Sequence, residues 1–198
     1  MFWDKVAWIY DFVEGIYNGK VYRGTGEVVA KEISEDDSVL ECACGTGAIS
    51  TCIAARCKHL IATDMSHGML KQAEKKLKKY DHVEVKSADI NKLEFEDGVF
   101  DKVVAGNVIH LLDDPYAALR ELLRVCKTGG KVIIPTYINI HGGKSSKAVK
   151  VFEKAGAGFK RQFDLESYRD FYKSAGCENV EYHCVEGKMP CAIAVITK

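Results

Sequence analysis

The stretch Ser38-Val-Leu-Glu-Cys-Ala-Cys-Gly-Thr-Gly-Ala-Ile-Ser50 decides the fold that this sequence predicts. A short apolar run leads into an acid, Glu41, then into a turn with two close glycines and a helical pattern from Ala48. A second apolar run follows and ends in another acid, Asp64. A strand, a glycine turn, a helix and a second strand ending in an acid are typical of half of a nucleoside-binding site.

The composition favours a single domain with an ordinary hydrophobic core. The chain has 198 residues, and its 28 Lys+Arg balance its 28 Asp+Glu. This balance argues against duplex nucleic acid or an anionic membrane as a bulk partner. No apolar run reaches the ~20 residues that span a bilayer, and the N-terminus lacks the basic and apolar regions of a signal peptide. We therefore expect a cytoplasmic protein, and the sequence carries no signal for an oligomeric state.

The eight cysteines are expected to be reduced and mostly buried. A chain of this length needs no disulfide framework, and thiols pack as small apolar groups. Cys42 and Cys44 lie at a strand end, where alternation points their side chains to opposite faces and makes zinc chelation awkward. No metal site is expected. Thiolates that capture a soft element such as arsenic are the functional alternative.

Apolar runs and helical patterns alternate through most of the chain. The expected strands are 39–42, 60–63, 83–86, 100–105 and 131–137, and the expected helices between them are 48–56, 66–80 and 114–127. We expect Ser66 and Asp114-Pro115 to begin two helices, and a glycine near Gly130 to end the second. This alternation implies a parallel sheet with helices on both faces. A helix at 165–175 and an antiparallel hairpin of 180–185 with 191–197 complete the chain.

Two segments depart from this alternation. Residues 1–34 are expected to form a helical cap, with a break at Gly24-Thr-Gly26, in front of a binding domain at 35–198. The pattern is weak over 139–162, where the chain leaves the fifth strand at the edge that binds ligands in open α/β sheets. This segment is either a lid or a plain surface excursion.

The glycine turn has two possible ligands. Gly45-Thr-Gly-Ala-Ile-Ser50 nearly fits the GxGxxG turn that holds a dinucleotide pyrophosphate, with Ser50 in place of the third glycine. However, Glu41 precedes the turn, and a carboxylate there would repel a pyrophosphate. The same carboxylate would suit a cationic group such as an α-ammonium. Alternatively, Glu41 accepts backbone N–H groups and shapes the turn.

Glu41-Cys-Ala-Cys-Gly-Thr-Gly47 resembles motif I of the class I S-adenosylmethionine (AdoMet)-dependent methyltransferases. Ala43 replaces the first glycine of that motif, which we expect to cost little because alanine is the next smallest residue. Phe100–His110 and Lys127–Ile134 resemble later segments of the same family, in the same order. The resemblance implies a Rossmann-like, doubly wound α/β sheet of seven strands in the order 3-2-1-4-5-7-6, with an antiparallel C-terminal hairpin strand.

The resemblance also implies which residues bind AdoMet and its product S-adenosylhomocysteine (AdoHcy). Asp64 resembles the acid whose carboxylate accepts both ribose hydroxyls, and Asp89 resembles the acid at the adenine amine. Met65 and Ile90 would enclose the adenine ring, unless they belong to the core. The expected cofactor-binding residues are Tyr10, Glu41, Cys42, Ala43, Gly45, Gly47, Asp64, Met65, Asp89, Ile90 and Asn107.

The function implied is methyl transfer from AdoMet to a small-molecule acceptor by in-line displacement. Tyr10 and Asp11 match a Tyr-Asp pair of the ubiquinone/menaquinone C-methyltransferase-like group. The acceptor could be a phenol, an amine, a lipid headgroup or a thiol, and no nucleic acid is expected. His110 is the candidate general base, although it could instead cap the next loop. An NAD-dependent oxidoreductase and a non-catalytic AdoMet-binding protein are the alternatives.

Overall fold

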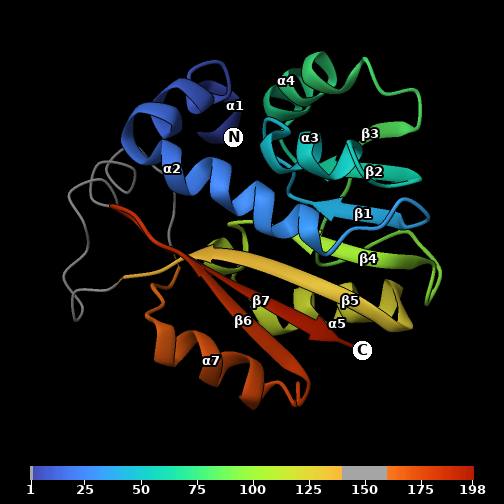
Figure 1. Cartoon of the computed structure of the whole chain (residues 1–198), viewed down its shortest axis with the longest axis vertical. Coiled ribbons are helices and arrows are strands. Elements are labelled where there is room, and N and C mark those ends of the chain that lie inside the picture. Colours follow the sequence, from blue (N-terminus) through green and yellow to red (C-terminus); the bar gives the residue numbers. More distant parts are fainter. Residues whose placement is uncertain (1, 140–159) are drawn as a thin grey trace.

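The computed structural model describes residues 2–139 and 160–198 (Figure 1). At its centre lies a seven-stranded sheet in the order β3-β2-β1-β4-β5-β7-β6. The strands are β1 Ser38–Cys42, β2 His59–Asp64, β3 Val83–Ser87, β4 Phe100–Ala105, β5 Cys126–Tyr137, β6 Val180–Val185 and β7 Cys191–Thr197. Strands β1 to β5 are parallel, and β7 pairs antiparallel with both β5 and β6. The predicted fold class and strand order are confirmed.

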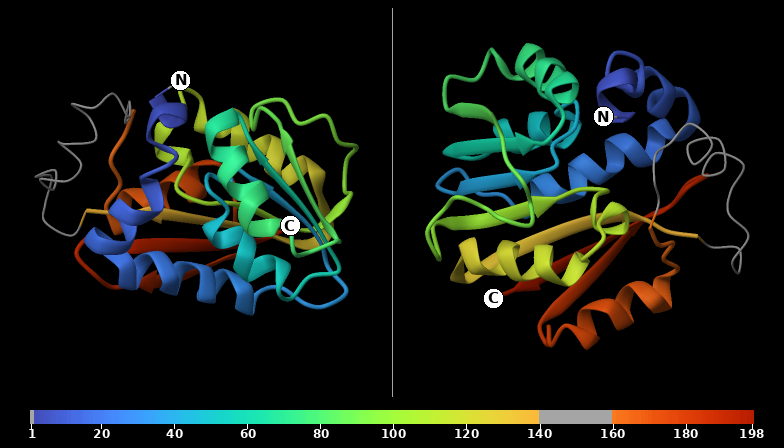
Figure 2. Two further views of the ribbon diagram at one scale, coloured as in Figure 1. Left: turned by 90° about the horizontal axis from the view of Figure 1, so that it is seen from above. Right: turned by 180° about the vertical axis from the view of Figure 1, so that it is seen from behind.

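Helices cover both faces of this sheet, as Figure 2 shows from two further sides. They are α1 Phe2–Val6, α2 Tyr10–Lys31, α3 Ala48–Ala54, α4 His67–Leu77, the 3-10 turn η1 Ile109–Leu111, α5 Pro115–Val125 and α7 Leu165–Ser174. No helix within the described ranges is long and apolar enough to cross a membrane. Most of the expected lid, residues 140–159, lies outside the described residues, so the lid stays a prediction.

Two apolar clusters hold the helices onto the sheet. Val39 of β1 packs in the cluster that contains α2, α3 and α4, whereas the next residue, Leu40, packs with α5 and α7. Successive strand residues point to opposite faces, so one strand contributes to both layers. Cys42 and Cys44 also fall in different clusters, which confirms that their side chains point apart.

The expected helix starts at Ser66 and Asp114 are confirmed. The Ser66 hydroxyl accepts the backbone N–H of Met69 at 3.2 Å, and the Asp114 carboxylate accepts that of Ala117 at 2.9 Å. Pro115 follows Asp114 as the first helical residue. Each side chain thus satisfies a backbone donor that the helix itself leaves without a partner.

The expected helix break at Gly24-Thr-Gly26 is wrong, because α2 runs through it to Lys31. Thr25 and Gly26 are buried, and a Cβ on Gly26 would lie 2.8 Å from the sulfur of Cys52. Packing against α3 therefore maintains the helix despite the low helical propensity of glycine. The helix bends instead at Asn18 (φ −137°, ψ 30°), whose side-chain amide donates to the carbonyl of Met189 at 2.7 Å.

The expected glycine end of the helix before β5 is also wrong. Helix α5 ends at Val125, and β5 begins at once with Cys126. The glycines lie inside this strand, where its register with β4 shifts between Phe100 and Lys102. Gly129 adopts φ +78° there. The glycines serve an irregularity of the strand rather than a helix cap.

Candidate functional site

A pocket lies where the carboxyl ends of β1, β2 and β4 meet one edge of the sheet, and we call it the glycine-turn pocket. Eight of the residues predicted to bind a cofactor line it: Tyr10, Glu41, Ala43, Gly45, Asp64, Met65, Ile90 and Asn107. Trp3, Tyr22, Cys44, Thr46 and Leu111 are among its other lining residues. The parallel register brings these segments together, because all three strands end at the same edge.

The glycine turn has three residues in the left-handed backbone region: Ala43 (φ +53°), Gly45 (φ +55°) and Gly47 (φ +82°). A Cβ on Gly47 would lie 3.2 Å from the Cα of Ala73, so this glycine lets the turn pack closely on α4. A Cβ on Gly45 would meet nothing within 4 Å. The positive φ of Ala43 is unfavourable by about 1–2 kcal/mol for a residue with a side chain. The expectation that alanine costs little here is therefore wrong, because it considered only the size of the residue.

Asp64 ends β2 and faces the glycine turn. Its carboxylate accepts the backbone N–H of Gly45 at 2.9 Å and that of Ser66 at 2.8 Å. Burial raises its pKa, and these backbone donors oppose that effect. Two oxygens provide about four acceptor positions, so some acceptor capacity remains for hydroxyl groups of a ligand. Asp64 thus both shapes the turn and presents acceptors to the pocket.

Glu41 is the most deeply buried acid of this pocket, with 1% of its surface exposed. Its Oε2 atom has no hydrogen-bond partner among the described residues. Burial raises its pKa to about 8; the nearby Ser50 hydroxyl opposes this rise, and the charge of Asp64 adds to it. A buried carboxylate oxygen without a partner is costly unless a donor or a cation meets it. It therefore suits a positively charged ligand group.

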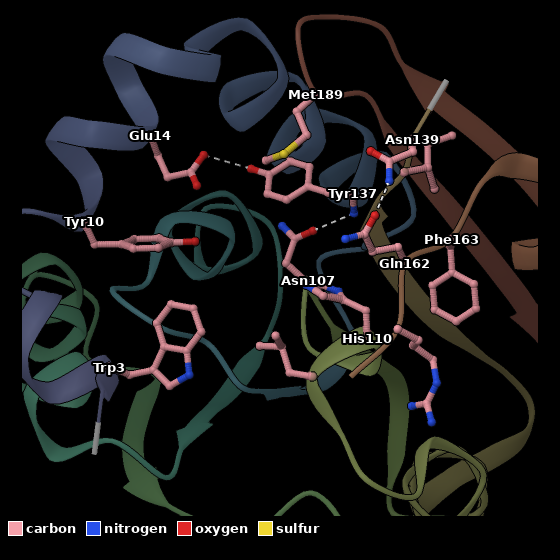
Figure 3. Close-up of a pocket in the computed structure, with 13 residues that line it drawn as sticks. Trp3, Tyr10, Glu14, Asn107, His110, Tyr137, Asn139, Gln162, Phe163 and Met189 are labelled. Atoms are coloured by element: carbon pink, nitrogen blue, oxygen red, sulfur yellow. Dashed lines mark hydrogen bonds between the residues drawn. The ribbon is translucent and has the colours of Figure 1, made fainter. Parts of the chain in front are cut away.

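A second pocket adjoins the first, and Figure 3 shows the side chains that line it. We call it the Glu14 pocket; its lining residues are Trp3, Tyr10, Glu14, Asn107, His110, Leu111, Tyr137, Ile138, Asn139, Arg161, Gln162, Phe163 and Met189. Trp3, Tyr10, Asn107 and Leu111 belong to both pockets. A ligand in one pocket therefore lies next to a ligand in the other.

Sequence reasoning missed Glu14 and Tyr137. Glu14 is 4% exposed, and its Oε2 accepts the hydroxyl of Tyr137 at 3.1 Å (Figure 3). Burial raises the pKa of Glu14, and Asp11 adds to the rise. One signal was available, because Glu14 stands four residues after Tyr10 and four before Asn18, on the face of the helix that points inward. An acid on that face is unusual unless it has a function.

Comparison with known proteins identifies the family. Residues 40–134 match the profile of the methyltransferase domain family. A phosphatidylethanolamine N-methyltransferase of Cereibacter sphaeroides is 32% identical over 80% of this chain and 76% of its own length. The chain belongs to the class I AdoMet-dependent methyltransferases. The chain is also 36% identical to a demethylmenaquinone methyltransferase of Clavibacter sepedonicus. This match covers 66% of the present chain and only 54% of the length of that relative.

Solved structures agree on the fold of this methyltransferase. A phosphoethanolamine N-methyltransferase of Haemonchus contortus, solved with phosphomonomethylethanolamine and AdoHcy, superposes with a TM-score of 0.78. The superposition covers 98% of this chain and 58% of that one, at 18% identity. At this identity the likeness supports the fold alone.

The residues of the glycine-turn pocket fit AdoMet, the cofactor of this family. The partnerless oxygen of Glu41 suits its α-ammonium, and the free acceptor positions of Asp64 suit a ribose diol. Gly45 leaves space for the main chain to approach a ligand. Met65 is 49% exposed while Ile90 is buried, and both line the pocket.

Three predicted residues of the methyltransferase do not line the glycine-turn pocket. The Cys42 side chain is buried in the cluster with α5 and α7. Gly47 begins α3 and packs against α4. Asp89 is exposed, and its carboxylate accepts the backbone and side-chain N–H groups of Asn91 at 2.9 and 3.0 Å. The turn at Asn91 thus holds Asp89 beside the pocket residues Ala88 and Ile90 rather than in the wall.

Two acids attach the N-terminal helices of the methyltransferase to the glycine-turn pocket. Asp11 accepts hydrogen bonds from the hydroxyls of Tyr22 (2.6 Å) and Thr46 (2.5 Å) and pairs with Lys76 of α4 (2.5 Å). Asp4 accepts from the Ser66 hydroxyl at 2.7 Å and from the backbone N–H of Gly68, in the first turn of α4, at 2.9 Å. These contacts hold the aromatic residues of α1 and α2 beside the pocket.

His110 lies in η1 and lines the Glu14 pocket (Figure 3). Burial and the nearby Arg161 lower its pKa to about 4. The imidazole is therefore neutral at pH 7, which makes it able to accept a proton but only a weak base. Its backbone carbonyl also accepts the N–H groups of Lys160 and Arg161 at 3.1 and 3.2 Å. The residue lies in a pocket, as a general base would, and its role as a base stays a prediction.

Proposed function

We propose that this chain transfers a methyl group from AdoMet in the glycine-turn pocket to a small-molecule acceptor in the Glu14 pocket. The observation that carries the proposal is the shared wall of the two pockets, formed by Trp3, Tyr10 and Asn107. Bound AdoMet supplies a methyl group on a sulfonium, so the transfer needs an acceptor positioned in line and shielded from water. Adjoining pockets with a common border provide this arrangement.

We assign the ribose hydroxyls to Asp64, the adenine amine to Asp89 and the α-ammonium to Glu41. Met65 and Ile90 enclose the adenine ring in this proposal. The main chain of Ala43, Gly45 and Asn107 and the ring of Tyr10 complete the cofactor site, while Cys42 and Gly47 shape the turn from outside the pocket. Support comes from the lining of the glycine-turn pocket and from the fit of its acids to a cationic ligand. His110 is assigned as a general base for hydroxyl and thiol acceptors, which must lose a proton.

The names of the relatives suggest two acceptor classes for this chain, a quinone precursor and an amine. Transfer to small molecules is common to both. An NAD-dependent oxidoreductase is disfavoured by the family membership. A non-catalytic AdoMet-binding protein would share the glycine-turn pocket but would not turn over any acceptor.

Calorimetric titration with AdoMet, AdoHcy and NAD tests the cofactor, and methyl-labelled AdoMet with a panel of amines, phenols and thiols tests the transfer. We expect AdoMet and AdoHcy to bind, NAD not to bind, and label to pass to at least one acceptor. Binding of NAD without AdoMet would refute the proposal. Binding of AdoMet with no labelled product from any acceptor would favour the non-catalytic alternative.

A further inference from the structure

Glu14 places a carboxylate in the wall of the Glu14 pocket. It is 4% exposed, and among the described residues no Lys, Arg or His forms an ion pair with it. Its one hydrogen bond in the described structure comes from the Tyr137 hydroxyl at 3.1 Å. Burying a carboxylate without a cation is unfavourable because the charge loses its hydration. A ligand that brings the cation would remove this cost.

The other charged group of the pocket does not supply that cation. Arg161 lines the pocket, but its guanidinium donates to the backbone carbonyls of Leu112 at 2.7 Å and Asp113 at 3.5 Å. His110 is neutral at pH 7 because its pKa is lowered to about 4. Neither Arg161 nor His110 therefore pairs with the Glu14 carboxylate, which lacks a cationic partner among the described residues.

Aromatic rings stand around this carboxylate. Figure 3 shows Trp3, Tyr10 and Tyr137 projecting into the same space as Glu14. The rings of Trp3 and Tyr10 lie edge to face, with centroids 6.1 Å apart and planes at 79°. Aromatic faces attract ammonium groups through the ring quadrupole, most strongly away from water. A carboxylate among such rings is a recurring way to bind an organic cation.

We propose that the Glu14 pocket binds an amine acceptor, with its ammonium group paired to the Glu14 carboxylate and enclosed by Trp3, Tyr10 and Tyr137. This inference rests on the proposed function, because it names the acceptor class of the same two-pocket site. A phenol acceptor would bring no positive charge and would leave the charge of Glu14 without a counterion.

The same carboxylate serves the proton step of such a reaction. An ammonium has no lone pair, so it must first lose a proton. The Glu14 carboxylate lies beside it in this proposal and acts as the base. Burial raises the pKa of Glu14 and makes it a better proton acceptor than an exposed glutamate. The proton passes to the Glu14 carboxylate, and the nitrogen lone pair then forms the N–C bond to the methyl group. The electron pair of the broken C–S bond stays on sulfur, which becomes the thioether of AdoHcy.

A matched pair of probes tests the proposal in the AdoHcy-saturated protein by calorimetric titration. Choline carries a trimethylammonium group, and 3,3-dimethyl-1-butanol has the same shape with a neutral carbon in place of nitrogen. We expect choline to bind at least about tenfold more tightly than the neutral compound, and ethanolamine to compete with choline. Glu14→Gln should remove this preference, while Glu27→Gln, an exposed acid of the same helix, should leave it unchanged.

The Glu14→Gln variant is expected to fold, because it replaces a buried charge with a neutral group of the same shape. Thermal unfolding and AdoHcy binding of the variant check this directly. Equal binding of choline and its neutral counterpart by the wild type, or a charge preference that survives Glu14→Gln, would overturn the amine assignment alone. Failure of the wild type to bind AdoHcy would instead remove the proposed function, and the acceptor assignment with it.

Discussion

Glu41 is protonated in most molecules at pH 7, because burial raises its pKa to about 8. A ligand ammonium beside it would favour the carboxylate and displace the proton. We therefore expect AdoHcy binding at pH 7 to release a proton, and the affinity to rise between pH 6 and pH 8. Calorimetry in buffers that differ in ionisation enthalpy measures the released proton directly. A wild-type protein that releases none would contradict the pairing of Glu41 with the ammonium.

The Glu41→Gln variant is the control for this measurement, and it also carries a stability prediction. The native pKa of Glu41 lies above its unfolded value of 4.5, so the native state holds the proton more strongly. This acid therefore makes stability fall as pH rises from about 4.5 to about 8. Glu41→Gln should bind AdoHcy without proton release and should lose less stability over that range. Urea unfolding at pH 5 and pH 8 tests the second point.

Asp64→Ala removes acceptors from both a ligand and the glycine turn. We expect AdoHcy binding to weaken by about 1–3 kcal/mol, the usual cost of leaving buried donors without a partner. Asp81→Ala, which changes an exposed acid in the turn before β3, should bind AdoHcy like the wild type. Unchanged affinity of Asp64→Ala in calorimetric titration would exclude Asp64 from the ribose site.

Individual residues were predictable where their role depends on a local pattern. Ser66 follows from the spacing of a helix start, and Asp64 from its place at the end of an apolar run. Helical spacing could place Glu14 on the inward face of α2, but it could not show its partner Tyr137, which lies far along the chain. Ala43 was judged by size alone, whereas its cost depends on the backbone conformation of the turn.

At the scale of elements, the start of α3 depends on Gly47. Its φ of +82° and the backbone of Ala73 at 3.2 Å both disfavour a side chain. Gly47→Ala should therefore lower the free energy of unfolding by about 1–2 kcal/mol. Gly15→Ala, at an exposed helical position with open space around it, should instead stabilise by about 0.5–1 kcal/mol. Urea unfolding of both variants measures the difference, and similar midpoints would contradict the packing of the turn on α4.

Asp11 connects α2 with the glycine turn and with α4. Asp11→Ala removes the contacts with Tyr22, Thr46 and Lys76, so the first turns of α2 should detach more often. We expect AdoHcy affinity to fall by about 1 kcal/mol and trypsin to cut faster at the N-terminal lysines. Asp36→Ala, in the exposed turn before β1, is the matched control. If both variants are cut at the wild-type rate, this attachment is not what holds the helix.

Elements were predicted well where periodicity is strong and less well where glycines occur. Gly24 and Gly26 suggested a break, but the buried face of α2 compensates for their low propensity. Gly129 and Gly130 suggested a helix end, but they serve an irregular part of β5 beside β4. In both places a neighbour that is distant in the sequence decides the conformation, so local signals could not.

Across the whole molecule, the two core clusters enclose most of the thiols. Cys42, Cys44, Cys57, Cys126 and Cys191 are buried, Cys52 and Cys177 are partly covered, and Cys184 is exposed. We expect a thiol reagent such as DTNB to modify Cys184 first in the native protein, and the buried cysteines only after unfolding. Cys184→Ser should remove the fast phase. A fast phase that persists in this variant would contradict the burial of the other thiols.

The architecture of the whole molecule followed from the order of strands and helices, because βαβ units have few ways to pack into a parallel sheet. The glycine-turn pocket followed as well, since its main residues end neighbouring strands. The Glu14 pocket could not be predicted from the order of strands and helices. Its walls come from α1, α2, η1, the end of β5 and Met189, and only tertiary folding brings these segments together.

The shared wall of the two pockets also links the binding of their ligands. Any ligand that moves Tyr10 or Asn107 alters the border of the neighbouring pocket, so the two binding free energies are not independent. Thermodynamic reciprocity then requires that each ligand change the affinity of the other by the same factor. In steady-state kinetics, such coupling would make the apparent KM for one substrate depend on the concentration of the other.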